Sequence, residues 1–349
     1  LIDGVVNGCP SHLLEPQRMN LIPYSEDFSN ASWGKARLSV SANQVISPNG
    51  ILNADYIEQA SGNNDSGGIF DGINFTAAKY TQSIFVKKKE KSFITLTENA
   101  SSASLRYSWF DIENGVIGTV NSGHTAKIEN YGNDWYRCSI TYTAINTGSG
   151  YSAFYYLADA DSSLTVVGSG GLYIWGAQLE EGSYPTSYIP NYGTSAGITR
   201  VAETANGAGD ASTFNDSEGV LMAEISALTN DSSFKSISVS DSSISDRISL
   251  SLYQNSVYAY IADGGQGKYD VNTTINVKEN NKIAVKYKVN DFSFYLNGFE
   301  INSSVGINGG TTPSGLANLS FDKGNGSDDF YGNTKQIQYF DSALNDSDL

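Results

Sequence analysis

The stretch Ile248-Ser-Leu-Ser-Leu-Tyr-Gln-Asn-Ser-Val-Tyr-Ala-Tyr-Ile261 alternates aliphatic residues with serines and tyrosines on both sides of Gln254-Asn255. Successive side chains of a β-strand point to opposite faces, so this alternation predicts two strands that each bury one face. If Gln254-Asn255 is a two-residue turn, the register of the hairpin follows. One face then pairs Leu252 with Val257, Leu250 with Ala259 and Ile248 with Ile261, and the other pairs Tyr253 with Ser256, Ser251 with Tyr258 and Ser249 with Tyr260.

A second stretch, Val285-Lys-Tyr-Lys-Val-Asn-Asp-Phe-Ser-Phe-Tyr-Leu-Asn-Gly-Phe-Glu-Ile301, repeats this pattern across two turns. A slip of one residue would move Lys286 and Lys288 into the core, at a large cost in desolvation free energy. We therefore expect a three-stranded antiparallel meander with one apolar face. Turns at Asn290-Asp291 and Asn297-Gly298 would pair Val289 with Phe292, Tyr287 with Phe294, Val285 with Leu296, Leu296 with Phe299 and Phe294 with Ile301.

Signals for strands extend through the rest of the chain. Gly (35 residues) and Tyr (22 residues) are frequent, hydrophobic residues make up 40% of the composition, and long segments with helical periodicity are missing. This mixture is typical of strands joined by tight turns. We expect further strands at residues 80–86, 92–97, 104–110, 116–120, 135–143, 151–158 and 171–179.

The length of the chain favours two domains, because 349 residues exceed the usual size of a single hydrophobic core. Residues 1–19 carry turn signals and two prolines, and we interpret them as a short extended N-terminal arm. Residues 20–191 and 215–349 are expected to form the domains, with residues 192–214 as a linker rich in Gly, Ala, Ser and Thr. The predicted fold is all-β, with two antiparallel β-sandwich (jelly-roll) domains in tandem after the arm.

Charge and cysteine content exclude several classes of protein. The net charge of −16 would repel nucleic acid and an anionic membrane surface, so neither is an expected partner. No run of eighteen apolar residues predicts membrane insertion. Cys9 and Cys138 are too few for a disulfide framework or a cysteine metal site. The first residues lack an initiator Met and a basic leader, so we expect that the chain is the remainder of a longer one.

Several blocks of sequence resemble known families. The arm, with Leu14-Glu-Pro-Gln-Arg18, and the three blocks that follow it resemble a module of bacteriophage virion and fibre proteins that is similar to carbohydrate-binding jelly rolls. Those blocks are Asn20-Leu-Ile-Pro-Tyr-Ser-Glu-Asp-Phe-Ser-Asn-Ala-Ser-Trp33, Asn133-Asp-Trp-Tyr-Arg-Cys-Ser139 and Leu172-Tyr-Ile-Trp-Gly-Ala-Gln-Leu-Glu-Glu-Gly-Ser-Tyr-Pro-Thr-Ser-Tyr-Ile-Pro190. The second domain resembles concanavalin A and laminin G lectin sandwiches at Glu218-Gly-Val-Leu-Met-Ala-Glu224, Phe294-Tyr-Leu-Asn-Gly-Phe299 and Phe330-Tyr-Gly-Asn-Thr-Lys-Gln-Ile-Gln-Tyr-Phe-Asp-Ser-Ala-Leu344.

These resemblances imply a non-catalytic fibre or head-decoration protein on a virion surface that displays sandwiches for host recognition. Its partners would be host-surface or environmental glycans, and other virion proteins through the arm. Fibre proteins of this kind imply a homo-oligomer, with a trimer as the commonest arrangement. The alternative is a secreted pair of carbohydrate-binding modules from an exported bacterial enzyme that acts on polysaccharides, or from an adhesin. Sandwiches of this shape serve all these roles, so the resemblance predicts fold more firmly than function.

The sequence offers no constellation for catalysis, and we expect no enzyme. Residues 219–226 contain Glu224 alone, so the paired carboxylates that glycosidases on such folds require are missing. The two histidines are His12, in the arm, and His124, which follows Ser122-Gly123 and is interpreted as a surface residue of a loop. A His and Cys metal site is excluded by these counts.

Binding sites are easier to predict. Aromatic rings stack on the apolar face of a pyranose, which makes Tyr151, Tyr155, Tyr258 and Tyr260 the candidates for carbohydrate binding. The alternative for each is cross-strand support within the sheet. Oxygen ligands in the segment 322–329 suggest a structural calcium site formed by Asp322, Asn325, Asp328 and Asp329, with an ordinary acidic turn as the alternative. Trp33, Trp135 and Trp175 are expected in the core, and Trp109 is left open.

Overall fold

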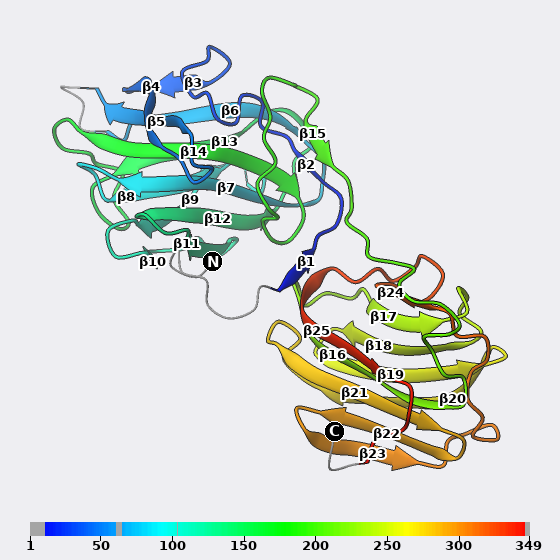
Figure 1. The fold of residues 1–349 in the computed structure, drawn as a ribbon. Coiled ribbons are helices and arrows are strands. Elements are labelled where there is room, and N and C mark those ends of the chain that lie inside the picture. The colour runs from blue at the N-terminus through cyan, green and yellow to red at the C-terminus, as the bar shows by residue number, and fades with distance from the viewer. Residues whose placement is uncertain (1–10, 61–64, 103, 346–349) are drawn as a thin grey trace. The chain divides into compact units, whose positions relative to one another are not determined.

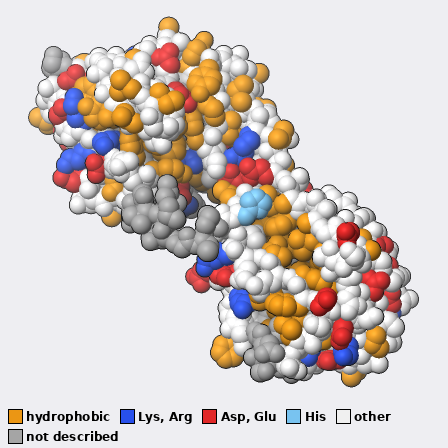
Figure 2. Space-filling model, in the orientation of Figure 1, with side chains coloured by type: hydrophobic (Ala, Val, Ile, Leu, Met, Phe, Trp, Pro, Cys, Tyr) orange, Lys and Arg blue, Asp and Glu red, His pale blue; other side chains and the backbone are white. Residues whose placement is uncertain are grey.

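The computed structural model describes residues 11–60, 65–102 and 104–345. These residues form strands, turns and loops without a helix, which confirms the all-β prediction. No helix among them could therefore span a membrane. Asp and Glu side chains are spread over both units on the face that Figure 2 shows, as expected for a chain with a net charge of −16.

The chain divides into two compact units, each built around two large sheets, and the first unit also contains the small two-stranded sheet β2-β15 (Figure 1). The first unit contains Gln17–Val201, and the second contains Ala202 onward together with the segment that ends at Pro16. The expected linker, residues 192–214, thus divides between the two units. The structure confirms two β-sandwiches in tandem.

The first unit packs two six-stranded antiparallel sheets against each other, in the orders β10-β9-β8-β13-β6-β3 and β11-β12-β7-β14-β5-β4. The first of these sheets contains β3 (Gly34–Ala36), β6 (Gly68–Phe75), β8 (Phe93–Glu98), β9 (Arg106–Asp111), β10 (Val116–Ile117) and β13 (Gly148–Ala158). The second contains β4 (Leu38–Ile46), β5 (Leu52–Gln59), β7 (Lys79–Lys88), β11 (Thr125–Asn130), β12 (Trp135–Thr143) and β14 (Gly171–Glu181).

Alternation along the strands builds the core of this unit. In β13, Ala153, Tyr155 and Leu157 are fully buried, while Phe154 and Tyr156 between them are half-buried on the opposite face. Residues of both sheets share one cluster, to which Ile94 and Leu96 contribute from one side and Ile84, Val86 and Ile140 from the other. Trp33, Trp135 and Trp175 are 2–3% exposed, which confirms their expected place inside the unit.

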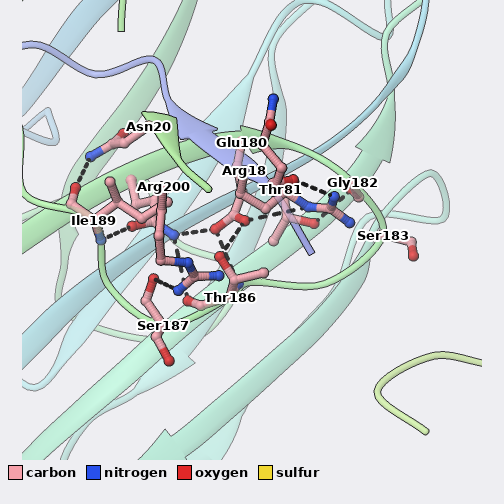
Figure 3. Close-up of polar contacts among 12 residues, drawn as sticks. Arg18, Asn20, Thr81, Glu180, Gly182, Ser183, Thr186, Ser187, Ile189 and Arg200 are labelled. Carbon is pink, nitrogen blue, oxygen red and sulfur yellow. Dashed lines mark hydrogen bonds and ion pairs between the residues drawn. The ribbon is translucent and has the colours of Figure 1, made fainter. Parts of the chain in front are cut away.

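A buried carboxylate ties the ends of the first unit to its sheet (Figure 3). Strand β2 (Arg18–Asn20) pairs with β15 (Ile198–Arg200), and Arg18 Nε lies 3.8 Å from the fully buried Glu180 of β14. Thr186 donates hydrogen bonds to Glu180 from its backbone N at 3.1 Å and from Oγ1 at 2.8 Å. Burial raises the pKa of Glu180, and the bonds from Thr186 and Gln178 oppose this rise. The carboxylate thereby joins the incoming strand and the segment after β14 to one sheet.

The second unit packs a six-stranded sheet, β1-β25-β16-β21-β22-β23, against a five-stranded sheet, β20-β19-β18-β17-β24. The first contains β1 (His12–Leu14), β16 (Glu218–Ala227), β21 (Asn281–Lys288), β22 (Asp291–Leu296), β23 (Phe299–Ser304) and β25 (Gly332–Phe340). The second contains β17 (Lys235–Ser240), β18 (Arg247–Tyr253), β19 (Ser256–Asp263), β20 (Gln266–Thr274) and β24 (Asn318–Ser320). Aliphatic and aromatic residues of both sheets share one core.

The structure corrects the prediction of an extended N-terminal arm. His12–Leu14 pairs with β25 as an edge strand, so this part of the chain belongs to the second sandwich rather than to a free extended arm. Arg18–Asn20 belongs to the first unit through its pairing with β15. Leu14 is 2% exposed, and burial of this side chain in the second core explains why the segment docks. The rest of the expected arm, residues 1–10 with Cys9, lies outside the described residues.

The register of the first predicted hairpin is confirmed at every pair from Tyr253 and Ser256 to Ile248 and Ile261. The predicted register of the meander is wrong. Tyr287 pairs with Phe292 and Val285 with Phe294, two residues away from the expected register. The turn is formed by Val289 and Asn290, where Asn290 has φ of 58°. A shift of two residues leaves every side chain on its expected face, so the hydrophobic pattern could not distinguish the two registers.

The third strand of the meander also differs from the prediction. Leu296 faces Phe299 as expected, but a bulge then places Phe294 opposite Asn302 rather than Ile301. Phe299 and Ile301 are 73% and 39% exposed. The buried apolar face therefore ends at β22, and β23 is an exposed edge strand.

Candidate functional site

The outward face of the five-stranded sheet in the second unit carries the two tyrosines predicted there. Val257, Ala259 and Ile261 of β19 are fully buried, so Tyr258 and Tyr260 point to the opposite, outward face and are half-buried. Ser251 and Ser249 of β18 lie across from these tyrosines on the same face. The sequence prediction of a serine and tyrosine surface is therefore confirmed.

The predicted acidic segment lies over this same face. The backbone N of Ser236, in β17, donates a hydrogen bond to the carbonyl O of Asp328 at 2.9 Å, and Asp329 forms a β-bridge with Ser236. Lys323 Nζ lies 3.1 Å from Asp328 Oδ2. Two features predicted separately, the tyrosine pair and the acidic turn, are thereby brought together.

Tyr258, Tyr260 and the acidic segment border a hollow of about 330 Å³. Phe234 and Tyr258 meet edge to face, with ring centroids 5.6 Å apart, and Phe234 stacks on Tyr253 at 4.3 Å. Around the rings lie hydroxyl groups and charges of both signs. The residues that line the hollow are Phe234, Ser236, Arg247, Ser249, Ser251, Tyr258, Tyr260, Asp270, Lys323 and Asp328.

Arg247 is the most constrained charge in this hollow. It is 8% exposed, and its Cζ lies 4.6 Å from the centroid of the Tyr260 ring. One terminal nitrogen donates to the carbonyl O of Ile244, while Nε has no hydrogen-bond partner within the described chain. Burial lowers the pKa of Arg247, and Tyr260 and Asp328 oppose this effect. A guanidinium remains protonated at neutral pH, so the hollow contains a partly desolvated cation.

This arrangement suits recognition of a polar ring more than acid or base catalysis. Aromatic faces can cover the C–H groups of a sugar, and guanidinium, hydroxyl and carboxylate groups can satisfy its hydroxyls. Asp328 is already paired with Lys323, and Asp270 is exposed. No histidine lines the hollow.

Tyr151 and Tyr155 are not a binding platform. Tyr155 is fully buried in the core of the first unit, and Tyr151 is half-buried and packs against that core. Tyr151 and Tyr155 share a face of β13, as predicted, but this face points toward the core and not toward solvent. The flanking Ala153 and Leu157 carried the missing signal, because they share the parity of Tyr155 and are apolar.

The four predicted calcium ligands have protein partners. Asp322 is 3% exposed and accepts a hydrogen bond from Asn206 Nδ2 at 2.8 Å. Asn325 accepts one from Ser327 Oγ at 2.6 Å, and Asp329 accepts one from Tyr331 at 3.1 Å. Over the described ranges, no three His, Cys, Asp or Glu side chains gather as metal ligands. Calcium binding by this segment stays a prediction.

The prediction that His124 is a surface residue of a loop is wrong, because this residue is buried. Its side chain is 0% exposed and hydrogen bonds to Glu98 and Ser108. His12, in β1, is exposed. The sequence analysis missed Arg247, although this residue immediately precedes Ile248 and shares the outward parity of Ser249 and Ser251. It could have been found by extending the alternation by one position.

No model of a known protein family matches the chain, and no curated protein matches it. Solved structures of low identity do match. The carbohydrate-binding module CBM40 of the Ruminococcus gnavus IT-sialidase is 15% identical, with 42% of this chain and 91% of the module covered and a TM-score of 0.35. Domains LG4-5 of the mouse laminin α1 chain are 9% identical, with 98% and 96% covered and a TM-score of 0.29. The LG1-3 region of the laminin α2 chain is 11% identical, with 81% and 66% covered and a TM-score of 0.31. Likenesses this distant assign no function to this chain.

Proposed function

We propose that the chain is a non-catalytic glycan-binding protein and that the hollow over β17, β18 and β19 is its binding site. The observation that carries the proposal is the convergence of Tyr258, Tyr260, Arg247 and Asp328 on one hollow. These residues come from two strands and a distant loop. They combine ring faces with charged hydrogen-bonding groups, which is what a sugar ring requires.

Each side chain has a defined part in this proposal. The rings of Tyr258 and Tyr260 cover the apolar face of one pyranose, and Phe234 limits the hollow on one side. The guanidinium of Arg247 donates hydrogen bonds to a ring or hydroxyl oxygen, and Asp270 accepts them from hydroxyls. Such groups fix the orientation of a ligand and select for the pattern of its hydroxyls.

A glycan array with the whole protein tests the proposal. We expect a defined set of saccharides to bind, and we expect Tyr258→Ala and Tyr260→Ala each to weaken binding roughly tenfold, because each removes one stacking face. Phe299→Ala is the matched control, since Phe299 is a 73% exposed ring on β23 of the other sheet. Absence of any bound saccharide, or equal binding by all three variants, would contradict the proposal.

For the biological setting we propose the surface of a virion, with an exported carbohydrate-binding module pair as the alternative. The resemblance of the sequence blocks motivates the first, and the glycan site is compatible with both. Portal, capsid or tail genes beside the coding sequence would support the virion setting, and a catalytic domain in the same reading frame would support the alternative. Light scattering on the purified protein tests the expected trimer.

A further inference from the structure

A second group of aromatic rings lies on the outward face of a sheet in the first unit. Phe70 of β6, Phe154 and Tyr156 of β13, and Tyr107 and Trp109 of β9 follow one another across this sheet. We call these five residues the aromatic platform. Ring centroids of neighbours are 5.4 Å apart for Phe70 and Phe154, 5.9 Å for Phe154 and Tyr156, 6.3 Å for Tyr156 and Tyr107, and 5.8 Å for Tyr107 and Trp109.

The rings form a continuous series of contacts, within which some pairs are nearly parallel and others tilted. The ring planes of Phe154 and Tyr156 differ by 15° and those of Tyr107 and Trp109 by 29°, whereas the planes of Phe70 and Phe154 differ by 39° and those of Tyr107 and Tyr156 by 50°. Four of the five residues are half-buried, and Trp109 is 9% exposed. None of them belongs to the core of this unit, to which Tyr155 and Leu157 contribute from the opposite face of β13.

Small residues at particular positions make room for the rings. Thr95 pairs with both Trp109 and Tyr156, and Thr97 pairs with both Tyr107 and Phe154. A methyl group at Gly68 would lie 2.3 Å from the ring of Tyr156. At Gly34 it would lie 2.3 Å from the ring of Phe70. The rings therefore spread over glycine and threonine, and a larger residue at either glycine would displace them.

The platform is hollowed beside Tyr107 and Tyr156, where a cavity of about 240 Å³ opens. One wall is fixed, because the backbone N and Oγ of Ser66 donate to the carbonyl O of Leu164 at 2.9 and 2.8 Å. Trp109 Nε1 donates to the carbonyl O of Ser163 at 3.1 Å and holds the same loop against the sheet. The residues that line this cavity are Arg37, Asp65, Ser66, Leu105, Tyr107, Tyr156 and Leu164.

Charge indicates which ligand fits. The lining carries one charge of each sign, and Arg37 already donates from Nε and a terminal nitrogen to the carbonyl O of Ser66 at 3.2 and 3.1 Å. The exposed carboxylate of Asp65 balances the charge of Arg37 and would repel an anion. Burial raises the pKa of Tyr107 and of Tyr156, so both hydroxyls stay protonated and can donate hydrogen bonds.

We propose that the aromatic platform binds a neutral, linear oligosaccharide, independently of the hollow in the second unit. One pyranose occupies the cavity at Tyr107 and Tyr156, and the next sugars of the chain lie over Phe154 and Phe70. Flat rings favour sugars whose axial C–H groups form a continuous apolar face. Asp65 and the tyrosine hydroxyls that line the cavity hydrogen bond with the hydroxyls at the edge of the sugar.

Titration calorimetry of the whole protein with cellohexaose, mannohexaose and chitohexaose tests the proposal. We expect at least one of these neutral hexasaccharides to bind, and Tyr107→Ala and Tyr156→Ala each to weaken that binding roughly tenfold or more. Tyr192→Ala is the control in the same unit, because Tyr192 is 74% exposed and lies outside the platform and its cavity. Circular dichroism verifies that each variant keeps its β-sheet signal.

Two further measurements separate this proposal from others. The Tyr258→Ala variant is expected to bind the neutral hexasaccharide as the wild type does, so failure of either site does not imply failure of the other. All four tryptophans lie between residues 33 and 175, so ligand binding at the platform should change tryptophan emission. Tighter binding of a hexagalacturonate, no binding of any neutral probe, or a loss of self-association in Tyr107→Ala by sedimentation would each overturn the proposal.

Discussion

His124 and Glu98 share a hydrogen bond of 3.1 Å between Nε2 and Oε1 inside the first unit, where neither side chain is exposed. On the other side of the ring, Nδ1 lies 2.8 Å from Ser108 Oγ. A serine, a histidine and a carboxylate in line have the order of a nucleophilic triad. Ser108 is fully buried, however, so a substrate has no path to its hydroxyl. The two hydrogen bonds of His124 connect β8, β9 and the loop before β11.

Replacing this histidine should destabilise the first unit. Burial acts to raise the pKa of Glu98, but the hydrogen bonds from His124 and Ser101 together leave it below the usual value. His124→Ala leaves a buried carboxylate with fewer donors and should cost roughly 2–4 kcal/mol of unfolding free energy. Urea denaturation followed by tryptophan fluorescence reports on the first unit alone, which contains all four tryptophans. His12→Ala, in the second unit, should leave this transition unchanged.

Protonation of the Asp71 carboxyl should raise the unfolding free energy of the first unit as the pH falls. Burial raises the pKa of this 8% exposed carboxyl to about 6, and Oδ2 has no hydrogen-bond partner within the described chain. Because the folded state binds the proton more tightly than the unfolded state, the contribution is complete below the ordinary pKa of 3.8 and is lost as the pH rises through 6. Asp71→Asn should therefore stabilise the unit at pH 7.5 by on the order of 1–3 kcal/mol, and by less at pH 5.

Asp55 provides the contrast for that experiment. Burial raises its pKa to about 6 as well, but backbone N–H groups of Phe28 and Asn43 donate to its two oxygens, each at 2.9 Å. An amide offers one acceptor oxygen in place of two, so Asp55→Asn should destabilise the unit. Equal effects of the two substitutions would contradict this assignment of roles.

Two glycines should respond in opposite ways to the same substitution. A methyl group at Gly171 would lie 1.6 Å from the backbone O of Ile57, where strands β14 and β5 pair. Neither strand can yield without breaking the sheet, so Gly171→Ala should cost roughly 3 kcal/mol or more. Gly72, in β6, is exposed and has nothing within 4 Å of the same methyl position. Gly72→Ala should be neutral or stabilising by up to about 1 kcal/mol. Thermal unfolding of both variants measures the difference.

Local alternation explains how much of the fold was predictable. It gave β7–β10, β12–β14, β18 and β19, the register of the last two strands and the outward position of Tyr258 and Tyr260, but it missed strands such as β4, β5, β17 and β20. Parity gives the inward face only together with the polarity of the neighbouring residues, and Tyr155 was assigned to the wrong face because the apolar Ala153 and Leu157 of the same parity were not considered. Parity also does not fix a register to better than two residues, as the turn at Val289 and Asn290 shows.

The parts that failed depend on contacts between distant residues. His124 is buried because Glu98 and Ser108 come from neighbouring strands, and no local pattern predicts those partners. The hollow over β17, β18 and β19 likewise needs Asp328 to reach Ser236, 92 positions away (328 − 236). Sequence reasoning identified Asp328 as a candidate ligand, but it did not predict strand β17 or the role of Ser236.

Arg247 should reveal a conflict between stability and binding in the second unit. Its guanidinium is 8% exposed with an unpaired Nε, so it costs desolvation free energy that a neutral side chain of similar length would not. Asp328 would keep Lys323 as its partner at 3.1 Å, and the carbonyl of Ile244 lies in a turn with a 45% exposed side chain where water can replace the lost donor. Arg247→Met should therefore raise the unfolding free energy by about 1 kcal/mol while weakening glycan binding at the hollow at least tenfold. Denaturation followed by far-ultraviolet circular dichroism and the glycan array measure the two quantities on one variant. A variant that loses stability and keeps its affinity would assign Arg247 to the sheet rather than to the ligand.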